Sequence, residues 1–492
     1  MSFSADPRPP DPRRWLALVF IGLAQLMIVL DVTIVNIALP SLQTDLGISD
    51  GDRQWVITGY TLAFGSLLFL GGRIADYTGR KRAFLIALIG FAAASALGGM
   101  AGNFELLLAS RVLQGLFGAL LAPATLSLIA VTFTDGRERA KAFGIFGAIA
   151  AGGGAIGLIL GGALTDYLDW RWCLYVNIPV ALVAAVGGYL VLSDARPEGH
   201  ARFDFLGVLL VSGGLVSIVY ACSEAESEGW GSTLVVGLFA IGAALLAAFV
   251  AVESKISQPL LPLRVLASRT RGGAYLAVAV AVVGLFGAFL FNTYYMQVVL
   301  GYSPVKTGVA FLPMSVAVLV AAGGISSRLM LKLPPRLLIV PGLLFGAAGM
   351  AWTATLEATT GYAQGVMTAQ LLLGFGMGLI MPVAMDYSTY GIAPEDAGVA
   401  SAGVNTSQQV GGSIGTALLN TIAASAAADY LVSHPKSPTL AKEAMTEGFG
   451  TAGSWAAAIM LVGAVVVALL MNTPRPARNA DKSAAVPAPA HL

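Results

Sequence analysis

The sequence predicts an all-α integral membrane protein, and three observations lead to that class. The 492 residues are 57% hydrophobic and only 11% charged. Apolar runs of the roughly 20 residues that a helix needs to cross a bilayer recur along the whole chain. The longest internal connection, 426–449, is too short for an appended domain. A soluble catalytic domain is therefore not expected.

Charge and residue counts exclude other classes. The formal net charge of +1 argues against a nucleic-acid partner. Two cysteines, Cys173 and Cys222, and three histidines are too few for a disulfide framework or a Cys/His metal centre. We expect the cysteines to be separate buried thiols near the outer face, with a disulfide as the less favoured alternative. No metal or cofactor is expected, and no cluster with catalytic spacing predicts an enzyme.

Fourteen membrane spans are predicted from apolar runs that contain few charges. The first is kept as a span because it is too long for a signal peptide and contains Asp31. In order, the spans cover 15–39, 54–72, 83–101, 104–130, 142–163, 176–193, 205–223, 232–252, 272–298, 307–327, 337–356, 364–385, 401–425 and 450–471.

The basic residues orient these spans. Lysine and arginine near span ends are retained in the cytoplasm, and most of them lie in the tails and connections that a cytoplasmic N-terminus places inside. The opposite side receives only Arg53, Arg171, Lys306, Lys436 and Lys442. Because the number of spans is even, both termini are predicted to be cytoplasmic in a multi-pass protein of the cell membrane.

A weak internal repeat predicts two halves. The segment GGRIADYTGRKRAF, which begins at Gly71, is echoed by GGISSRLMLKLPPRLL, which begins at Gly323. Duplicated halves that rock about a site at mid-membrane are typical of secondary transporters. The predicted organisation is a disordered tail 1–14, a six-helix bundle 15–193, two inserted helices 205–252, a second six-helix bundle 272–471 and a disordered tail 472–492.

Two ionised side chains are predicted deep within the membrane, Asp31 in the first span and Arg111 in the fourth. Buried charges are costly there unless they face protein or water. At about 1.5 Å per helical residue, both lie roughly 10–12 Å below the outer surface, so they can meet. An ion pair that forms in one conformation and breaks in another makes protonation conformation-dependent, as a proton-coupled pump requires. A static pair between two helices is the alternative.

Other residues are candidates to support this pair. Gln114 follows Arg111 by three residues, so it shares the same helix face and is expected to orient the guanidinium. The connection after the second span combines glycines with charges that could form a turn and a latch between moving halves. Its residues are Gly72, Arg73, Asp76, Gly79 and Arg80. A plain cytoplasmic turn is the alternative.

A glycine stripe in the span 142–163 predicts close helix packing. Its members are Gly144, Gly153, Gly157, Gly161 and Gly162. The span 401–425 repeats this pattern around Gln408. The outer segment 438–449 is expected to form a short helix at the surface, without an assigned function.

These segments together resemble the fourteen-helix drug:proton antiporter branch of the major facilitator superfamily, which the EmrB and QacA multidrug exporters typify. The resemblance covers most of the chain. It rests on LDVTIVNIALPSL (30–42), GGRIADYTGRKR (71–82), RVLQG (111–115), GIFGAIAAGGGAIGLILGG (144–162), YYMQVVLGYSPVKTGVAFLP (294–313) and NTSQQVGGSIGTAL (405–418).

The resemblance implies two six-helix bundles with two inserted helices, driven by the proton-motive force. It implies proton coupling by Asp31 and Arg111, a cytoplasmic latch of Asp76 with Arg73 and Arg80, and glycines in the span 142–163 that seal against leak. Two positions depart from the family pattern. Leu158 stands where proline is usual, and Gln408 stands where arginine is common.

The predicted function is proton-coupled export of hydrophobic or amphipathic small molecules by a monomer in the bilayer. Residues at plausible cavity depth are Tyr60, Phe289, Asn292, Tyr294, Met296 and Gln408, for each of which ordinary core packing is the alternative. A dedicated exporter of one metabolite or antibiotic is the second candidate function. Proton-coupled import is less favoured, and a receptor or channel is remote because the spans offer no ring of like charges.

Overall fold

The computed structural model describes residues 12–133, 135–193, 204–256, 268–330, 332–389 and 397–472. Every regular element in these ranges is a helix, which confirms the predicted all-helical class. Thirteen helical segments in the described chain are long and apolar enough to cross a membrane. The remaining predicted span corresponds to α2, a helix of 24 residues. The predicted tails fall almost entirely outside the described residues.

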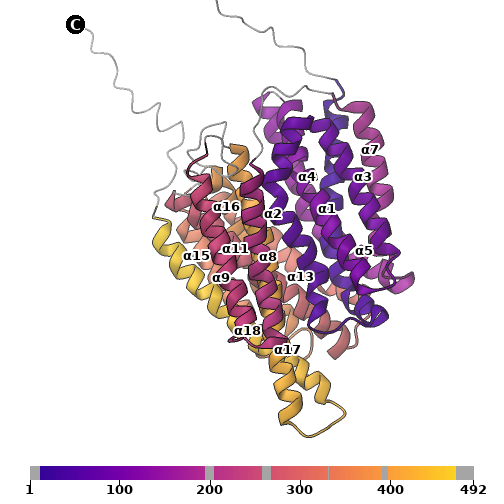
Figure 1. Cartoon of the computed structure of the whole chain (residues 1–492), viewed down its shortest axis with the longest axis vertical. Coiled ribbons are helices and arrows are strands. Elements are labelled where there is room, and N and C mark those ends of the chain that lie inside the picture. The colour runs from indigo at the N-terminus through magenta and orange to yellow at the C-terminus, as the bar shows by residue number, and fades with distance from the viewer. Residues whose placement is uncertain are drawn as a thin grey trace, which may run out of the picture.

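The first six predicted spans pack together on one side of the molecule (Figure 1). Within this group α4 packs against α2 and α3, while α1 packs against α5 and α7. Gly79 alone joins α2 to α3, and its φ of 96° favours glycine over any other residue. The elements are α1 (Arg14–Leu46), the 3₁₀ turn η1 (Asp52–Gln54), α2 (Trp55–Thr78), α3 (Arg80–Gly99), α4 (Phe104–Thr132), α5 (Gly136–Tyr167), α6 (Trp172–Tyr175) and α7 (Asn177–Val191).

The last six predicted spans form the other side, in pink to yellow in Figure 1. Two of them contain π-helical stretches, η2 (Tyr295–Val299) and η3 (Val320–Ser326). The α-helices are α11 (Arg269–Tyr294), α12 (Pro304–Ala310), α13 (Leu312–Leu319), α14 (Ser327–Leu329), α15 (Arg336–Thr353), α16 (Val366–Thr389), α17 (Ala397–Ser433) and α18 (Leu440–Leu470).

The two central helices, α8 (Phe205–Glu228) and α9 (Thr233–Glu253), lie beside the line along which the halves meet. α8 packs against α2 of the first half, α17 of the second and α9. At its outer end Ser223 accepts hydrogen bonds from Gln54 Nε2 (3.0 Å) and Trp55 Nε1 (2.9 Å). The inserted pair therefore covers the seam between α2 and α17.

The structure differs from the prediction at the outer ends of the last two spans. The sequence predicts a short surface helix over 438–449, but from Leu440 onward this segment is the beginning of α18. Its inner face is buried through Ala444 and Phe449, and Gly448 lies against the Ala423 carbonyl of α17. Because this packing continues, the helix does not break, and the tips of α17 and α18 project beyond the other helices in Figure 1.

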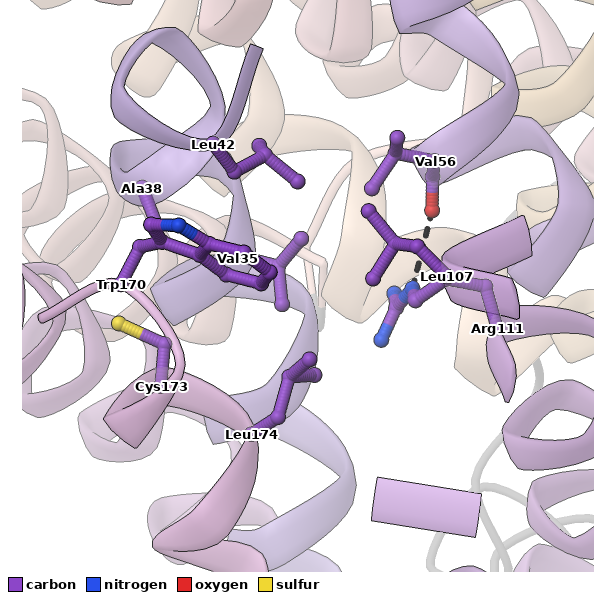
Figure 2. Close-up of a pocket in the computed structure, with 9 residues that line it drawn as sticks. All are labelled: Val35, Ala38, Leu42, Val56, Leu107, Arg111, Trp170, Cys173 and Leu174. Atoms are coloured by element: carbon purple, nitrogen blue, oxygen red, sulfur yellow. Dashed lines mark hydrogen bonds between the residues drawn. The ribbon is translucent and has the colours of Figure 1, made fainter. Parts of the chain in front are cut away.

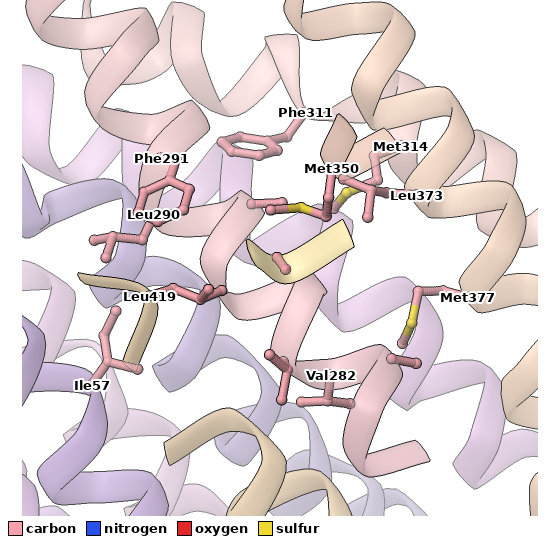
Figure 3. Packing of buried hydrophobic residues seen from close by; sticks show 14 of the residues in the cluster. Ile57, Val282, Leu290, Phe291, Phe311, Met314, Met350, Leu373, Met377 and Leu419 are labelled. Carbon is pink, nitrogen blue, oxygen red and sulfur yellow. The ribbon is translucent and has the colours of Figure 1, made fainter. Parts of the chain in front are cut away.

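The interior of the second half is rich in methionine. Its core cluster, which also takes in the outer part of α1, contains Met296, Met314, Met350, Met377, Met460 and Met471. Figure 3 labels Met314, Met350 and Met377 among the buried side chains of this cluster. Among the described residues, the corresponding cluster of the first half contains a single methionine, Met27. Methionine side chains adapt to irregular shapes, and the second core contains more of them than the first.

Candidate functional site

Asp31 and Arg111 are in direct contact inside the first half. Arg111 Nη1 donates to Asp31 Oδ2 at 2.6 Å, and the two residues are 1% and 0% exposed. Local structure sets this register, because Asn103 caps α4 by accepting from the Leu106 amide at 2.9 Å. Arg111 then lies two turns into the helix, at the level of Asp31 in the middle of α1.

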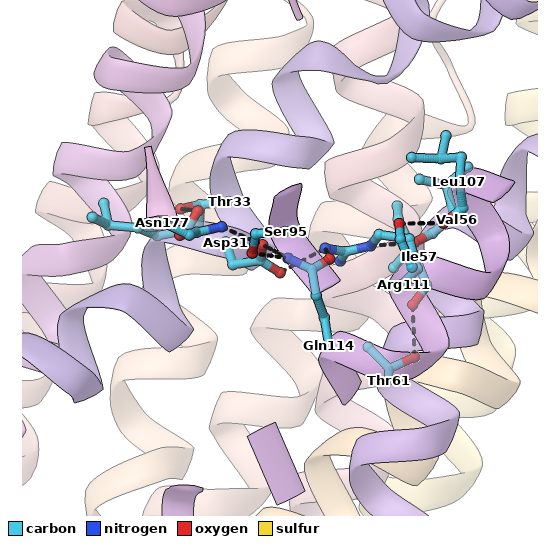
Figure 4. A network of polar contacts seen from close by, with 12 residues as sticks. Asp31, Thr33, Val56, Ile57, Thr61, Ser95, Leu107, Arg111, Gln114 and Asn177 are labelled. Carbon is cyan, nitrogen blue, oxygen red and sulfur yellow. Dashed lines mark hydrogen bonds and ion pairs between the residues drawn. The ribbon is translucent and has the colours of Figure 1, made fainter. Parts of the chain in front are cut away.

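Two amide side chains complete the environment of Asp31 (Figure 4). Gln114 Nε2 donates to Asp31 Oδ1 at 2.8 Å, and Asn177 Nδ2 donates to the same oxygen at 2.9 Å. Gln114 also donates to Ser95 Oγ of α3 at 2.8 Å. Side chains of α4 and α7 thus bind the carboxylate on α1, and α3 joins the network through Gln114. The two amides and the Arg111 guanidinium supply three donors to this carboxylate in this conformation.

Arg111 is shared between Asp31 and α2. Its Nε donates to the Val56 carbonyl at 2.9 Å, and its guanidinium lies 4.6 Å from the centre of the Tyr60 ring. Gln114 Oε1 accepts a further bond from Nη1 at 2.7 Å. Because α2 also packs against α17 of the second half, Arg111 connects the carboxylate to a helix at the seam.

An apolar layer separates this network from the outer face. A cavity of about 10 Å³ lies beside Arg111 (Figure 2). That volume is close to one water molecule, so it cannot hold a drug-sized ligand. Apart from Arg111, its lining residues are Val35, Ala38, Leu42, Val56, Leu107, Trp170, Cys173 and Leu174.

Polar contacts join the halves at their outer ends. Arg53, which is 3% exposed, donates to Asn420 Oδ1 of α17 at 3.1 Å and pairs with Asp50 at 3.0 Å. Its guanidinium lies 4.2 Å from the centre of the Tyr294 ring of α11. Further contacts between the halves are Thr293 with Asn36 (3.3 Å), Gln297 with the Ile37 carbonyl (2.9 Å) and Thr61 with Ser413 (2.8 Å).

The glycines of α5 face two different partners. A Cβ on Gly153 would lie 3.0 Å from Leu26 of α1, and one on Gly161 would lie 2.8 Å from the Ile34 Cα of the same helix. A Cβ on Gly157 would meet the Thr33 hydroxyl more closely still. Gly162 instead approaches the Pro304 carbonyl of α12 in the second half. Gly144 has open space around it, so it takes no part in this packing.

The predicted cytoplasmic latch is only partly described. Gly79 forms the turn, Gly72 lies near Pro123 of α4, and Arg73 and Arg80 are half-buried. The side chain of Asp76 lies outside the described residues. The latch therefore stays a prediction.

The structure places the predicted cavity residues in several different contacts. Tyr60 stacks under Arg111, and Tyr294 contacts Arg53. Phe289 packs on Phe311 with ring centres 5.2 Å apart, and Met296 is fully buried. The remaining two are Gln408, half-buried with Nε2 3.9 Å from Met381 Sδ, and Asn292, which is fully buried.

Sequence reasoning missed Asn177, Ser95 and Arg53. Asn177 is the first residue of α7 and lies among apolar residues, so a polar residue at the start of a span was its only signal. The sequence places Arg53 in an outer connection, whereas the structure buries it between the halves. Cys173 and Cys222 are both buried and unpaired, consistent with separate thiols.

A membrane-embedded helical assembly with two groups of spans, an interface between them and a buried acid–guanidinium pair has the architecture of a secondary transporter. The chain belongs to the major facilitator superfamily, whose family model matches residues 21–416. The predicted family is therefore confirmed, and the protein is a multi-pass membrane protein.

Several similar proteins are named for antibiotics. The chain is 51% identical over 485 residues to puromycin resistance protein pur8 of Streptomyces alboniger, covering 98% of this chain and 96% of the relative. It is 36% identical to cephamycin export protein CmcT of Amycolatopsis lactamdurans (83% and 85% covered). It is 32% identical to multidrug efflux pump LfrA of Mycolicibacterium smegmatis (83% and 81% covered).

Solved structures support the fold alone. An auto-inhibited peptide transporter of the POT family aligns with a TM-score of 0.67 at 15% identity, covering 95% of this chain and 98% of that structure. A bacterial homologue of the human lysosomal transporter Spinster, described as inward-facing, aligns with a TM-score of 0.66 at 16% identity, covering 94% and 98%.

Proposed function

We propose that this protein exports hydrophobic or amphipathic small molecules, antibiotics among them, from the cytoplasm in exchange for protons. The observation that carries the proposal is the buried carboxylate of Asp31, held by Arg111, Gln114 and Asn177. The names of the relatives supply the substrate class, since they include resistance and export proteins for single antibiotics and a multidrug pump.

The coupling step follows from the position of Arg111 between α1 and α2. When the halves tilt, α2 moves with the seam that it forms with α17, and the Val56 carbonyl and Tyr60 ring draw Arg111 away from Asp31. A separated, ionised Asp31 is costly in the membrane, so it takes up a proton. Return of Arg111 favours release of that proton on the other side.

The driving force is sufficient for concentrative export. A proton that moves inward supplies about 2.3 kcal/mol per 100 mV and about 1.4 kcal/mol per pH unit. Either contribution alone is enough for a tenfold gradient of a neutral substrate, which needs about 1.4 kcal/mol.

A narrower function is the second candidate. The relative with 51% identity carries the name of a single antibiotic, puromycin, in its title. This favours a dedicated exporter with the same coupling machinery and a more selective cavity. A panel that contains puromycin and an unrelated hydrophobic cation, such as tetraphenylphosphonium, distinguishes the two functions.

The test is transport of that panel in everted membrane vesicles with simultaneous recording of internal pH. Parent protein is expected to show substrate-dependent proton efflux, Asp31→Asn to abolish it, and Arg111→Ala to reduce it at least tenfold. Asp166→Asn is the matched control, because Asp166 is an exposed carboxylate near the outer end of α5. Proton movement that survives in both Asp31→Asn and Arg111→Ala excludes this pair from coupling.

A further inference from the structure

The second half contains two buried amide side chains that the coupling mechanism does not use. Asn292 in α11 and Gln370 in α16 are both 0% exposed. Among the described residues, neither the nitrogen nor the oxygen of either amide has a hydrogen-bond partner. Leaving such groups unpaired in the interior destabilises a protein. A folded chain that keeps two of them therefore points to a function for these amides.

Gln370 occupies the position that corresponds to Arg111. Arg111, Gly115 and Pro123 in α4 have the same spacing as Gln370, Gly374 and Pro382 in α16. The packing also corresponds, since Gly115 lies against the Tyr60 carbonyl of the second span in its half. Gly374 lies in the same way against the Met314 carbonyl of the second span in the other half.

Asn292 occupies the position that corresponds to Asp31. Asp31 and Asn36 are separated by five residues in the first span of one half, as Asn292 and Gln297 are in the first span of the other. Both helices contribute to the seam more than one turn beyond these two residues, where Gln297 Nε2 donates to the Ile37 carbonyl at 2.9 Å. α11 packs against α16 as α1 packs against α4. The charged pair of the first half thus has a neutral counterpart in the second.

The helix segments that carry these two amides are uncharged, and the core of this half contains flexible side chains. No Asp, Glu, Lys or Arg occurs within ten residues of either amide along the chain. The core of this half contains the methionines shown in Figure 3 and the Phe289–Phe311 pair. Flexible methionine side chains can move aside for a bulky hydrophobic molecule. An amide can both donate and accept, which suits an uncharged polar group and gives no preference for an ion.

We propose that Asn292 and Gln370 are the hydrogen-bonding part of a substrate site within the second half, for an uncharged amide, carbonyl or hydroxyl group on a hydrophobic molecule. The proposal rests on the export function above and assigns its polar specificity. In this proposal the first half couples transport to protons, and the second half recognises neutral polar groups of the substrate. Both amides are covered in this conformation, so ligand reaches them only after the helices move.

The test compares two probes and two variants in the purified full-length protein. Puromycin offers amide and hydroxyl groups, whereas tetraphenylphosphonium has no hydrogen-bonding group. Asn292→Leu and Gln370→Met replace each amide by an apolar side chain of similar size. Thr353→Val is the control, because Thr353 is buried in the same half but its hydroxyl is satisfied by the Gly349 carbonyl of its own helix at 3.1 Å.

Each amide variant is expected to raise the half-saturating concentration of puromycin about tenfold and to leave that of tetraphenylphosphonium within twofold. Both variants should unfold at or above the melting temperature of the parent, since a buried unpaired amide is removed. Proton coupling of tetraphenylphosphonium transport should be unchanged. Equal puromycin affinity in parent and variants, measured by thermal shift in detergent, overturns the proposal.

The thermal-shift measurement separates this proposal from the export function. If the parent protein binds puromycin but moves no protons with it, the export proposal fails while the amide site is still tested. If coupled transport is intact and the amide variants behave like Thr353→Val, only the amide site is wrong.

Discussion

At the residue scale, the central feature is how completely Asp31 is held. Separating a buried ionised pair costs about 3–5 kcal/mol. One proton that crosses 100 mV and one pH unit supplies about 3.7 kcal/mol in total. The two magnitudes are similar, so Arg111 cannot leave an ionised Asp31 without consuming the driving force. Protonation of Asp31 and departure of Arg111 are therefore expected to occur together.

Asn177→Ala tests the contribution of the donor that sequence reasoning missed. Loss of a hydrogen bond to a charged group is expected to lower the free energy of unfolding by about 1.5–3 kcal/mol, which thermal unfolding in detergent measures. Ser110→Ala is the matched control, because Ser110 is buried in α4 and donates only to its own helix, at the Leu107 carbonyl. A stability of Asn177→Ala equal to that of Ser110→Ala shows that Asn177 contributes nothing to the network.

At the element scale, α5 packs closely along α1. Gly153, Gly157 and Gly161 let the backbone of α5 approach α1 closely over the turns on either side of Asp31. Gly162 and the Leu158 carbonyl meet Pro304 and Gly308 of α12 on the far side. The helix α5 therefore contacts both α1, which carries Asp31, and the second half of the molecule. The carbonyl of Leu158 lies in this contact, and α5 continues past Leu158 as an uninterrupted helix.

Substituting alanine at two glycines of α5 separates packing from helix propensity. At Gly161 the added Cβ lies 2.8 Å from the Ile34 Cα and 3.0 Å from its carbonyl oxygen. Because backbone atoms cannot move aside cheaply, Gly161→Ala is expected to lose about 1–3 kcal/mol of stability and most transport. Gly144→Ala meets nothing within 4 Å and should be neutral or slightly stabilising. Equal behaviour of the two variants, measured by thermal unfolding and vesicle transport, contradicts this packing role.

At the scale of the whole molecule, the halves meet through a polar layer at their outer ends. Arg53 is its centre, since it reaches α17 through Asn420 and α11 through Tyr294. Alternating access requires this layer to separate when the outer side opens. We therefore expect the buried Arg53 to stabilise the outer-closed state relative to the outer-open one.

Arg53→Ala is expected to shift the protein toward the outer-open state. In a Thr293→Cys background, a membrane-impermeant thiol reagent added outside should label the buried position roughly tenfold faster, which corresponds to about 1.4 kcal/mol. Arg171→Ala is the control, because its half-exposed pair with Asp45 at 2.9 Å lies within the first half and contributes little. Unchanged labelling in Arg53→Ala removes Arg53 from the gate.

Much of the site was predictable because helices in a membrane are nearly parallel and have a fixed rise. Counting residues from the span ends placed Asp31 and Arg111 at one depth, and the structure brings them into contact. Gln114 followed from helical periodicity. Counting along one helix gives no azimuthal direction, so it could not show that α7 turns Asn177 toward the same carboxylate. The burial of Arg53 could not be predicted for a similar reason. It lies in the short turn η1 and is covered by α17, which is far away along the chain.

The sequence alone determined the class, the number of spans and the family, because these depend on local hydropathy, span length and short motifs. Only the tertiary structure decided which faces meet: the position of α8 beside the α2–α17 seam, the division of the α5 glycines between two partners, and the neutral amide pair opposite the charged one. Lipid solvates all apolar faces alike, so hydrophobicity cannot select a neighbour within the membrane. Close backbone contacts and buried hydrogen bonds between residues far apart in the chain make that choice.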